Sequence, residues 1–194
     1  MSGDENRRLP NTYDIVLEAI GAAIIVIGSY ISLTVLTVPF TLQTLAIFAV
    51  LMTTGGKRGT VSIFCYLLLG TIGLPVFAGF KGGFASILGP TGGFLIGFIP
   101  MGLIYLVLAD KVFDIESMSR GRRVAFKAWI SVVCELVLYI VGVAWFMTVY
   151  AAQTGPVGLM TALGWCVFPF LIPDAVKIVF AITVSEACRG AVKK

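Results

Sequence analysis

The sequence predicts an all-α membrane protein, a bundle of six transmembrane helices that forms a single membrane domain over residues 1–194. Of the residues, 58% are hydrophobic and only 12% are charged, and the mean hydropathy is +1.00. A soluble domain of this length is far more polar. The apolar stretches are of helix length and lack the sustained alternation of β-barrel strands. No large soluble segment remains that could hold an ATPase domain.

The first predicted span covers residues 15–36. Its apolar run is too long for a signal peptide, and the residues before it are too acidic. Two short spans follow at 42–54 and 60–73, after a break marked by Pro39. At 1.5 Å per residue, the span at 42–54 covers only about 20 Å of a hydrocarbon core of roughly 30 Å. Non-helical backbone that lines a cavity or is buried in protein must fill the rest. The remaining predicted spans are 94–109, 124–150 and 165–187.

Residues 74–93 are predicted to form this non-helical segment, because glycine, proline and phenylalanine dominate the stretch. Glycine lets backbone N–H groups approach a ligand, and phenylalanine supplies apolar walls. A merely flexible loop is the alternative, although such loops are usually more polar. The nearby Gly55-Gly56-Lys57 lacks the earlier glycine and the following hydroxyl residue of a phosphate loop, which argues against nucleotide binding.

An aspartate and a lysine, Asp174 and Lys177, interrupt the apolar last span. Their spacing puts both on one helix face about one turn apart, and Pro173 suits the first turn of that helix. A charge at bilayer depth costs roughly 2.5 to 3.5 kcal/mol on insertion scales, so such residues usually face a bundle interior or a polar cavity. The pair is therefore the first candidate for a ligand site, with a structural brace as the alternative. Glu135, in the fifth span, either faces the bundle or pairs with a partner.

The basic residues predict which side of the membrane each end faces. With six spans, one side carries both termini and twelve lysines and arginines, whereas the other side carries only Lys81. Because basic residues accumulate on the cytoplasmic side, we expect cytoplasmic termini and a cavity that opens outward. This distribution explains the net charge of +4 without nucleic acid. The twelve residues are Arg7, Arg8, Lys57, Arg58, Lys111, Arg120, Arg122, Arg123, Lys127, Arg189, Lys193 and Lys194.

The sequence offers no metal site and no cofactor motif. The chain has no histidine, and its four cysteines lie singly in apolar segments, so we interpret them as buried hydrophobic residues. An intramembrane enzyme that uses Asp174 and Lys177 as acid and base is an alternative function, but no nucleophile accompanies them. The cysteines are Cys65, Cys134, Cys166 and Cys188.

Four motifs stand at the breaks of this pattern, at residues 38–44 (VPFTLQT), 73–79 (GLPVFAG), 89–93 (GPTGG) and 173–177 (PDAVK). In this order they resemble the biotin-specific S components (BioY) of energy-coupling factor vitamin transporters, over nearly the whole chain. Members of that family are six-helix proteins of the prokaryotic plasma membrane. They capture biotin from outside and work with a membrane coupling subunit and two cytoplasmic ATPases. The resemblance implies a high-affinity biotin-binding subunit that catalyses no reaction and uses no cofactor.

The resemblance also implies the residues of the site. Asp174 would accept hydrogen bonds from the ureido N–H groups of biotin. Lys177 would hold Asp174 ionised, donate to the ureido carbonyl or meet the ligand carboxylate. Lys81 is our candidate for that carboxylate. It stands where relatives can have a small polar residue, and Leu95 stands where some have arginine, so an S component for another small vitamin is an alternative. The other implied ligand contacts are Phe40, Gln43, Phe77, Thr91, Gly92 and Gly93.

Ala19 and Ala23 lie one turn apart on the first predicted span. Small residues at this spacing let another helix approach closely in lipid, and ordinary small-residue content is the alternative. The family carries an Ala-x-x-x-Ala contact motif on this span, which these two residues match. The resemblance therefore implies that they contact the coupling subunit.

Overall fold

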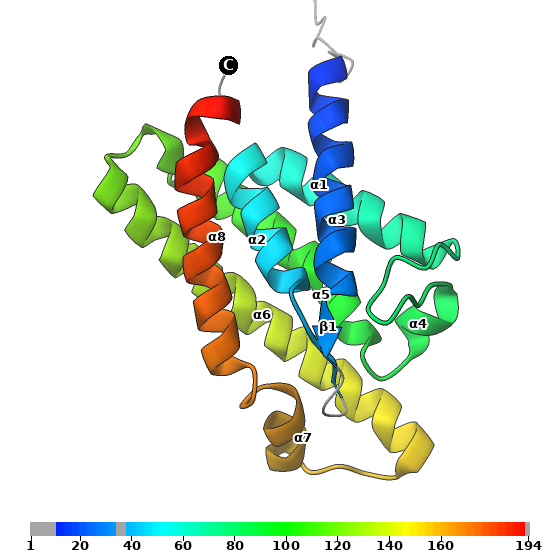
Figure 1. The fold of residues 1–194 in the computed structure, drawn as a ribbon. Helices are drawn as coiled ribbons and strands as arrows, with labels where there is room; N and C mark the ends of the chain where they lie inside the picture. The colour runs from blue at the N-terminus through cyan, green and yellow to red at the C-terminus, as the bar shows by residue number, and fades with distance from the viewer. Residues whose placement is uncertain (1–10, 34–37, 193–194) are drawn as a thin grey trace, which may run out of the picture.

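The computed structural model describes residues 11–33 and 38–192, with side chains described up to residue 189. Helices dominate it, so the predicted all-α class is confirmed (Figure 1). Part of the first predicted span, residues 34–36, lies outside the described residues. The same holds for four of the basic residues used to predict the topology: Arg7, Arg8, Lys193 and Lys194.

The first half of the chain forms α1 (Thr12–Tyr30), β1 (Ser32–Leu33), β2 (Phe40–Thr41), α2 (Gln43–Thr54) and α3 (Gly56–Thr71). Helix α1 ends at Tyr30 and does not continue to residue 36. The chain enters an antiparallel hairpin there, in which Ser32 lies opposite Thr41. The backbone N–H of Leu42 donates to the carbonyl of Ile31 at 3.1 Å, which brings the start of α2 back beside the end of α1.

The second half forms α4 (Phe84–Leu88), α5 (Gly92–Tyr105), a π-helical continuation (Leu106–Val112), a 3₁₀ turn (Ile115–Ser117), α6 (Arg120–Thr154), α7 (Leu159–Cys166) and α8 (Leu171–Val192). Helix α6 extends beyond the predicted 124–150 at both ends. The last predicted span, 165–187, is broken instead of continuous, because α7 and α8 meet at a bend of 43°. The break places Pro173 in the first turn of α8, where its missing N–H costs nothing.

Within the described residues, three helices are long and apolar enough to cross a membrane: α1, α5 with its π-helical continuation, and α6. The bent pair α7–α8 makes a fourth if it forms one span. Helices α2 and α3 have 12 and 16 residues, so each is shorter than the roughly 20 residues of a full crossing. The total of six spans and the single-domain organisation stay predictions.

The core lies around α2, which packs against α1, α3 and α8, while α5 packs along α6 (Figure 1). Its centre is formed by fully buried Ile47, Leu51 and Tyr66. Gly59 of α3 lies directly against the backbone of Leu51, where a Cβ would clash. Such small residues allow helices to approach closely in a membrane, and this packing fixes the short helices beside the long ones.

Both described chain ends lie at the same end of the bundle, together with the α2–α3 turn and the segment before α6 (Figure 1). Ion pairs join these parts: Arg58 with Asp14 at 2.6 Å, and Arg189 with Glu116 at 3.2 Å. The hairpin and the α6–α7 connection lie at the opposite end. The predicted basic residues that the structure describes are thus gathered at one end, and Lys81 lies away from them.

Candidate functional site

A cavity of about 540 Å³ lies between the start of α2, the segment 77–91, and helices α5, α6 and α8. Most of its walls are apolar side chains, such as Phe94, Phe98 and Phe170. Polar side chains converge on it from α2, α6 and α8. A volume of this size, with few polar groups on apolar walls, is typical of a small-molecule site.

Asp174 and Lys177 lie in the wall of this cavity, on the face of α8 that the sequence predicts. Lys177 Nζ donates to Asp174 Oδ1 at 2.7 Å. Only 5% of Asp174 and 6% of Lys177 are exposed. The backbone N–H of Asp174 donates to the carbonyl of Phe170 at 2.8 Å, across the break before α8. The α7–α8 bend therefore determines where the charge pair enters the cavity.

Three further side chains hold the pair in place. Tyr139 of α6 donates its hydroxyl to Asp174 Oδ2 at 2.6 Å. Thr44 of α2 accepts from Lys177 Nζ at 3.1 Å and lies 3.4 Å from Asp174 Oδ1, to which its hydroxyl donates. Lys177 Nζ also lies 4.2 Å from the centre of the Phe40 ring, a favourable cation–π position. A buried ion pair needs such extra hydrogen bonds to offset its lost hydration.

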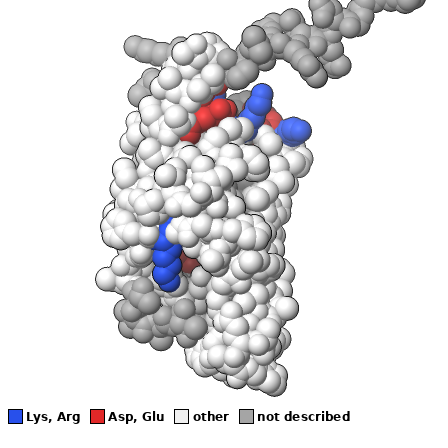
Figure 2. Space-filling model, turned by 90° about the vertical axis from the view of Figure 1, so that its right-hand side faces the viewer, with Lys and Arg blue, Asp and Glu red and all other residues white. Residues whose placement is uncertain are grey.

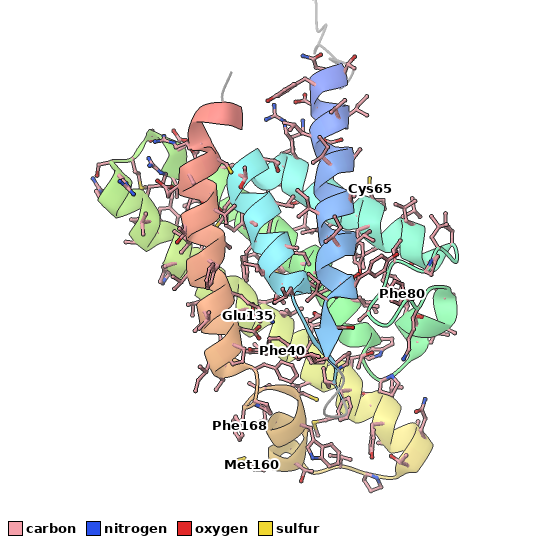
Figure 3. All side chains as sticks on the ribbon, in the orientation of Figure 1. Phe40, Cys65, Phe80, Glu135, Met160 and Phe168 are labelled. Atoms are coloured by element: carbon pink, nitrogen blue, oxygen red, sulfur yellow. The ribbon has the colours of Figure 1, made fainter. Side chains whose placement is uncertain are left out.

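Glu135 of α6 lines the same cavity and is 6% exposed. Figure 3 shows it in the region where α6, α8 and the hairpin residue Phe40 meet. Within the described part of the chain, neither of its carboxyl oxygens has a hydrogen-bond partner. It lies within electrostatic range of both Asp174 and Lys177. Of the two positions left open by the sequence, Glu135 therefore faces the bundle interior.

Lys81 also lines the cavity, but it is exposed. Its segment is tied down by hydrogen bonds: the N–H of Phe77 donates to the Lys81 carbonyl at 2.9 Å, and Ser29 Oγ of α1 donates to the Val76 carbonyl at 2.6 Å. Figure 2 shows that most charged side chains on this face gather at its upper end, and that only a basic side chain with an acidic one deeper beside it lies further down. Lys81 is thus a cation at the rim of the cavity, whereas Lys177 is buried in its wall.

Three other predicted contacts line the cavity: Gln43, Phe77 and Thr91. Gln43 Nε2 donates to the Tyr66 hydroxyl at 3.0 Å, which leaves its amide oxygen available. Phe77 is 2% exposed and packs edge-on against Tyr66, with 5.5 Å between ring centres. Thr91 directly precedes α5. Together they join the polar and apolar walls between α2 and α5.

The remaining three predicted contacts, Phe40, Gly92 and Gly93, are not among the described residues that line the cavity. Phe40 packs behind the site, against Lys177. Gly92 lies against the backbone of Ile87, and Gly93 against the side chain of Trp145, so a Cβ at either position would clash. These glycines hold α5 close to α4 and α6. They shape the cavity wall from behind. The spacing of a sequence motif alone does not distinguish this role from direct contact with a ligand.

Sequence reasoning assigned no role to Tyr139 and Thr44, and left that of Glu135 open. Thr44 closes the first motif, at 38–44, but nothing in the sequence indicates that it meets α8. Glu135 and Tyr139 are four residues apart, so they share one face of α6. Two polar residues at this spacing in an apolar helix are a signal that was present in the sequence. Tyr150 and Gln153, near the end of α6, also line the cavity.

Ala19 and Ala23 lie on the outer face of α1, and both are exposed. The opposite face of α1, which includes Gly21, Ala22 and Ile25, packs into the bundle. The predicted contact motif is therefore not used by the helix packing of this chain. Elsewhere, the described residues contain no group of three or more Cys, Asp or Glu side chains that could hold a metal ion.

The sequence model of the BioY family matches residues 4–194 of the chain. The chain belongs to this family. The probable biotin transporter BioY of Pyrococcus horikoshii is 34% identical to it over 177 residues, which are 91% of this chain and 96% of that protein. The biotin transporter BioY of Rhizobium etli is 35% identical over 142 residues, 72% of this chain and 76% of that protein.

A solved structure extends the likeness to the fold. The crystal structure of the S component for biotin from an ECF-type ABC transporter has a TM-score of 0.76 and 26% identity, over 91% of this chain and 90% of that chain. As a BioY family member, the chain is a multi-pass protein of the cell membrane and a transporter subunit. The intramembrane-enzyme alternative is thereby excluded, since these relatives are named as transporters.

Proposed function

We propose that the chain is the biotin-binding subunit of an uptake transporter and that it captures biotin in the 540 Å³ cavity. The observation that carries this proposal is the order of polar, apolar and charged side chains along the cavity. A buried polar cluster of Asp174, Lys177 and Glu135 lies in its wall, apolar side chains surround it, and Lys81 lies at its rim. The relatives that are named as biotin transporters support the same substrate.

Biotin offers a matching order of groups. Its ureido ring carries two N–H donors and a carbonyl acceptor, its thiophane ring and chain are apolar, and its valerate ends in a carboxylate. The ureido ring would lie against Asp174 and Lys177, where charge-assisted hydrogen bonds are strong. The carboxylate would point to Lys81, where it keeps much of its hydration.

Calorimetry on the purified protein tests this function. We expect biotin to bind and to be recovered unchanged by mass spectrometry of the small molecules that copurify with the protein. Lipoate and thiamine serve as matched controls, since lipoate carries the same valerate but no ureido ring. Tight binding of another vitamin, with no binding of biotin, would support the alternative S component that Lys81 and Leu95 suggest.

We further propose that the cavity opens outward and that both termini are cytoplasmic, as the distribution of basic residues predicts. A membrane-impermeant amine reagent added to intact cells tests this orientation. Lys81 should be labelled, whereas Lys111, at the opposite end of the bundle, should be protected. The reverse labelling would invert the topology.

As an S component the chain works with an energy-coupling factor module, and we propose that Ala19 and Ala23 form the docking surface for its membrane coupling subunit, which acts with two cytoplasmic ATPases. Both alanines are exposed, and close helix contacts in lipid depend on small side chains. Ala19→Leu with Ala23→Leu should leave biotin binding intact but abolish copurification with the coupling subunit and ATP-driven uptake. Ala144→Leu, on the exposed face of α6, is the matched control. Normal uptake by the double variant would mean that this face meets only lipid.

A further inference from the structure

Glu135 is the one acidic side chain of the described cavity wall whose acceptors are unused. It lies on α6, one turn before Tyr139, and is 6% exposed. Neither of its carboxyl oxygens is hydrogen-bonded within residues 11–33 and 38–189. Buried polar groups in native proteins are nearly always paired, so an unpaired carboxyl facing a cavity indicates a partner that enters the cavity.

Asp174, by contrast, has little acceptor capacity left. A carboxylate offers about four lone-pair positions. Lys177 and Thr44 donate to Oδ1, at 2.7 Å and 3.4 Å, and Tyr139 donates to Oδ2 at 2.6 Å. About one position on Oδ2 therefore remains for a ligand. The aspartate holds the site together and can accept one further donor, but not two.

The donors near Glu135 are equally committed. The ammonium of Lys177 has three N–H bonds, and it meets Asp174 at 2.7 Å, Thr44 at 3.1 Å and the face of the Phe40 ring at 4.2 Å. The hydroxyl of Tyr139 is donated to Asp174. A bracing role for Glu135 would have to run through the neighbouring carboxyl of Asp174, because no other side chain in the described structure donates to its oxygens.

The ligand chemistry supplies the missing donor. In a five-membered cyclic urea the two N–H bonds diverge on opposite sides of the carbonyl, so a single carboxylate does not take both with good geometry. We propose that Glu135 accepts one ureido N–H of the bound ligand and that Asp174 accepts the other. This inference rests on the proposed function, because it assigns the second hydrogen-bond acceptor for the same substrate.

The test combines Glu135→Gln with biotin and its two N-methylated analogues, each of which lacks one ureido N–H. In the wild-type protein both analogues should bind more weakly than biotin. Glu135→Gln should weaken biotin binding by about 2- to 10-fold, the loss typical of one hydrogen bond. For the analogue that lacks the N–H facing Glu135, the same substitution should have almost no effect. Such non-additivity is the mark of a direct contact.

Three results would overturn the proposal. The first is wild-type biotin affinity in Glu135→Gln. The second is an equal loss for biotin and for both analogues, which would mean that Glu135 only shapes the cavity. The third is full affinity of the wild-type protein for either analogue, a measurement that needs no folded variant. Failure of the wild-type protein to bind biotin at all would instead refute the proposed function, so the two failures are distinguishable.

Discussion

Helices α6 and α8 carry two buried charge clusters that differ in one respect. The paired cluster consists of Arg123, Lys127 and Glu186, and in it every charged group is hydrogen-bonded. The cavity cluster consists of Asp174, Lys177 and Glu135, and in it the Glu135 carboxyl accepts no hydrogen bond from any described residue. The two clusters are close: Lys127 and Glu135 are eight residues apart, or about 12 Å along α6.

This difference in hydrogen bonding indicates a structural role for the paired cluster and supports a ligand-binding role for the cavity cluster. Arg123 donates to both oxygens of Glu186, at 2.9 Å and 2.6 Å, and Lys127 donates to the same carboxylate at 2.9 Å. These groups join the ends of α6 and α8, and each of them is hydrogen-bonded to another member of the cluster. The cavity beside them, lined by Lys127 and Ser185, is about 210 Å³. Burial of charge thus does not by itself identify a binding site, and the unused acceptor in the larger cavity is what supports the proposed one.

The largest expected effect is on stability, in the paired cluster. Glu186→Gln removes the hydrogen-bonded counter-charge of both Arg123 and Lys127 and leaves Lys127 only Glu116, at 3.8 Å, so we expect the free energy of unfolding to fall by roughly 3 to 5 kcal/mol. Thermal unfolding in detergent measures the change. The matched control is Asp14→Asn, which breaks a half-exposed pair with Arg58 at the same end and should cost at most about 1 kcal/mol. Equal effects of the two substitutions would contradict the structural role.

The next effect is on affinity, in the cavity cluster. Asp174→Asn removes a charged acceptor and should weaken biotin binding by about 10- to 100-fold, measured by calorimetry. Its cost in stability should be smaller than that of Glu186→Gln, because Glu135 still lies within electrostatic range of Lys177. Lys177→Ala should also weaken binding, since it leaves Asp174 uncompensated.

If both Asp174→Asn and Lys177→Ala bind biotin with wild-type affinity, the cavity cluster is a brace like the paired cluster. The comparison between the two clusters would then fail. If Asp174→Asn destabilises the protein as much as Glu186→Gln does, the proximity of Glu135 to Lys177 provides no compensation.

The sequence predicts the members of these clusters unequally, for a physical reason. Asp174 and Lys177 were predicted to act together because their contact is local, set by helical spacing on one element. Thr44 and Tyr139 reach the same pair from α2 and α6. Tertiary packing alone decides such contacts. The unused acceptors of Glu135 follow from that same packing, so no pattern in α6 predicts them.

The fold shows the same limit at its breaks. Apolar stretches located the helices, but the end of α1 at Tyr30 depends on pairing between β1 and β2, two strands of only two residues each. Strands this short carry no readable alternation. The break between α7 and α8, with its bend of 43°, contains Phe170, which is buried in a hydrophobic cluster, although Pro173 already indicated a helix start there.

The smallest expected effect concerns the rim of the cavity. Lys81 is exposed, and exposed ion pairs are usually worth about 0.2 to 1 kcal/mol. Lys81→Ala should therefore weaken biotin binding by only about 1.5- to 5-fold, far less than a change at Asp174. The loss should shrink as salt is added, because salt screens charges in water. Calorimetry at low and high ionic strength measures both effects.

A comparison of biotin with its methyl ester tests whether Lys81 contacts the ligand carboxylate or only borders the cavity. Biotin methyl ester lacks the negative charge, so it should bind equally well to the wild-type protein and to Lys81→Ala. Lys81→Arg keeps the positive charge and should retain the affinity for biotin. A loss of more than 10-fold, or the same loss for biotin and its ester, would place Lys81 among the groups that build the cavity. The distinction between a buried polar cluster that recognises the ureido ring and a hydrated rim that attracts the carboxylate would then have to be abandoned.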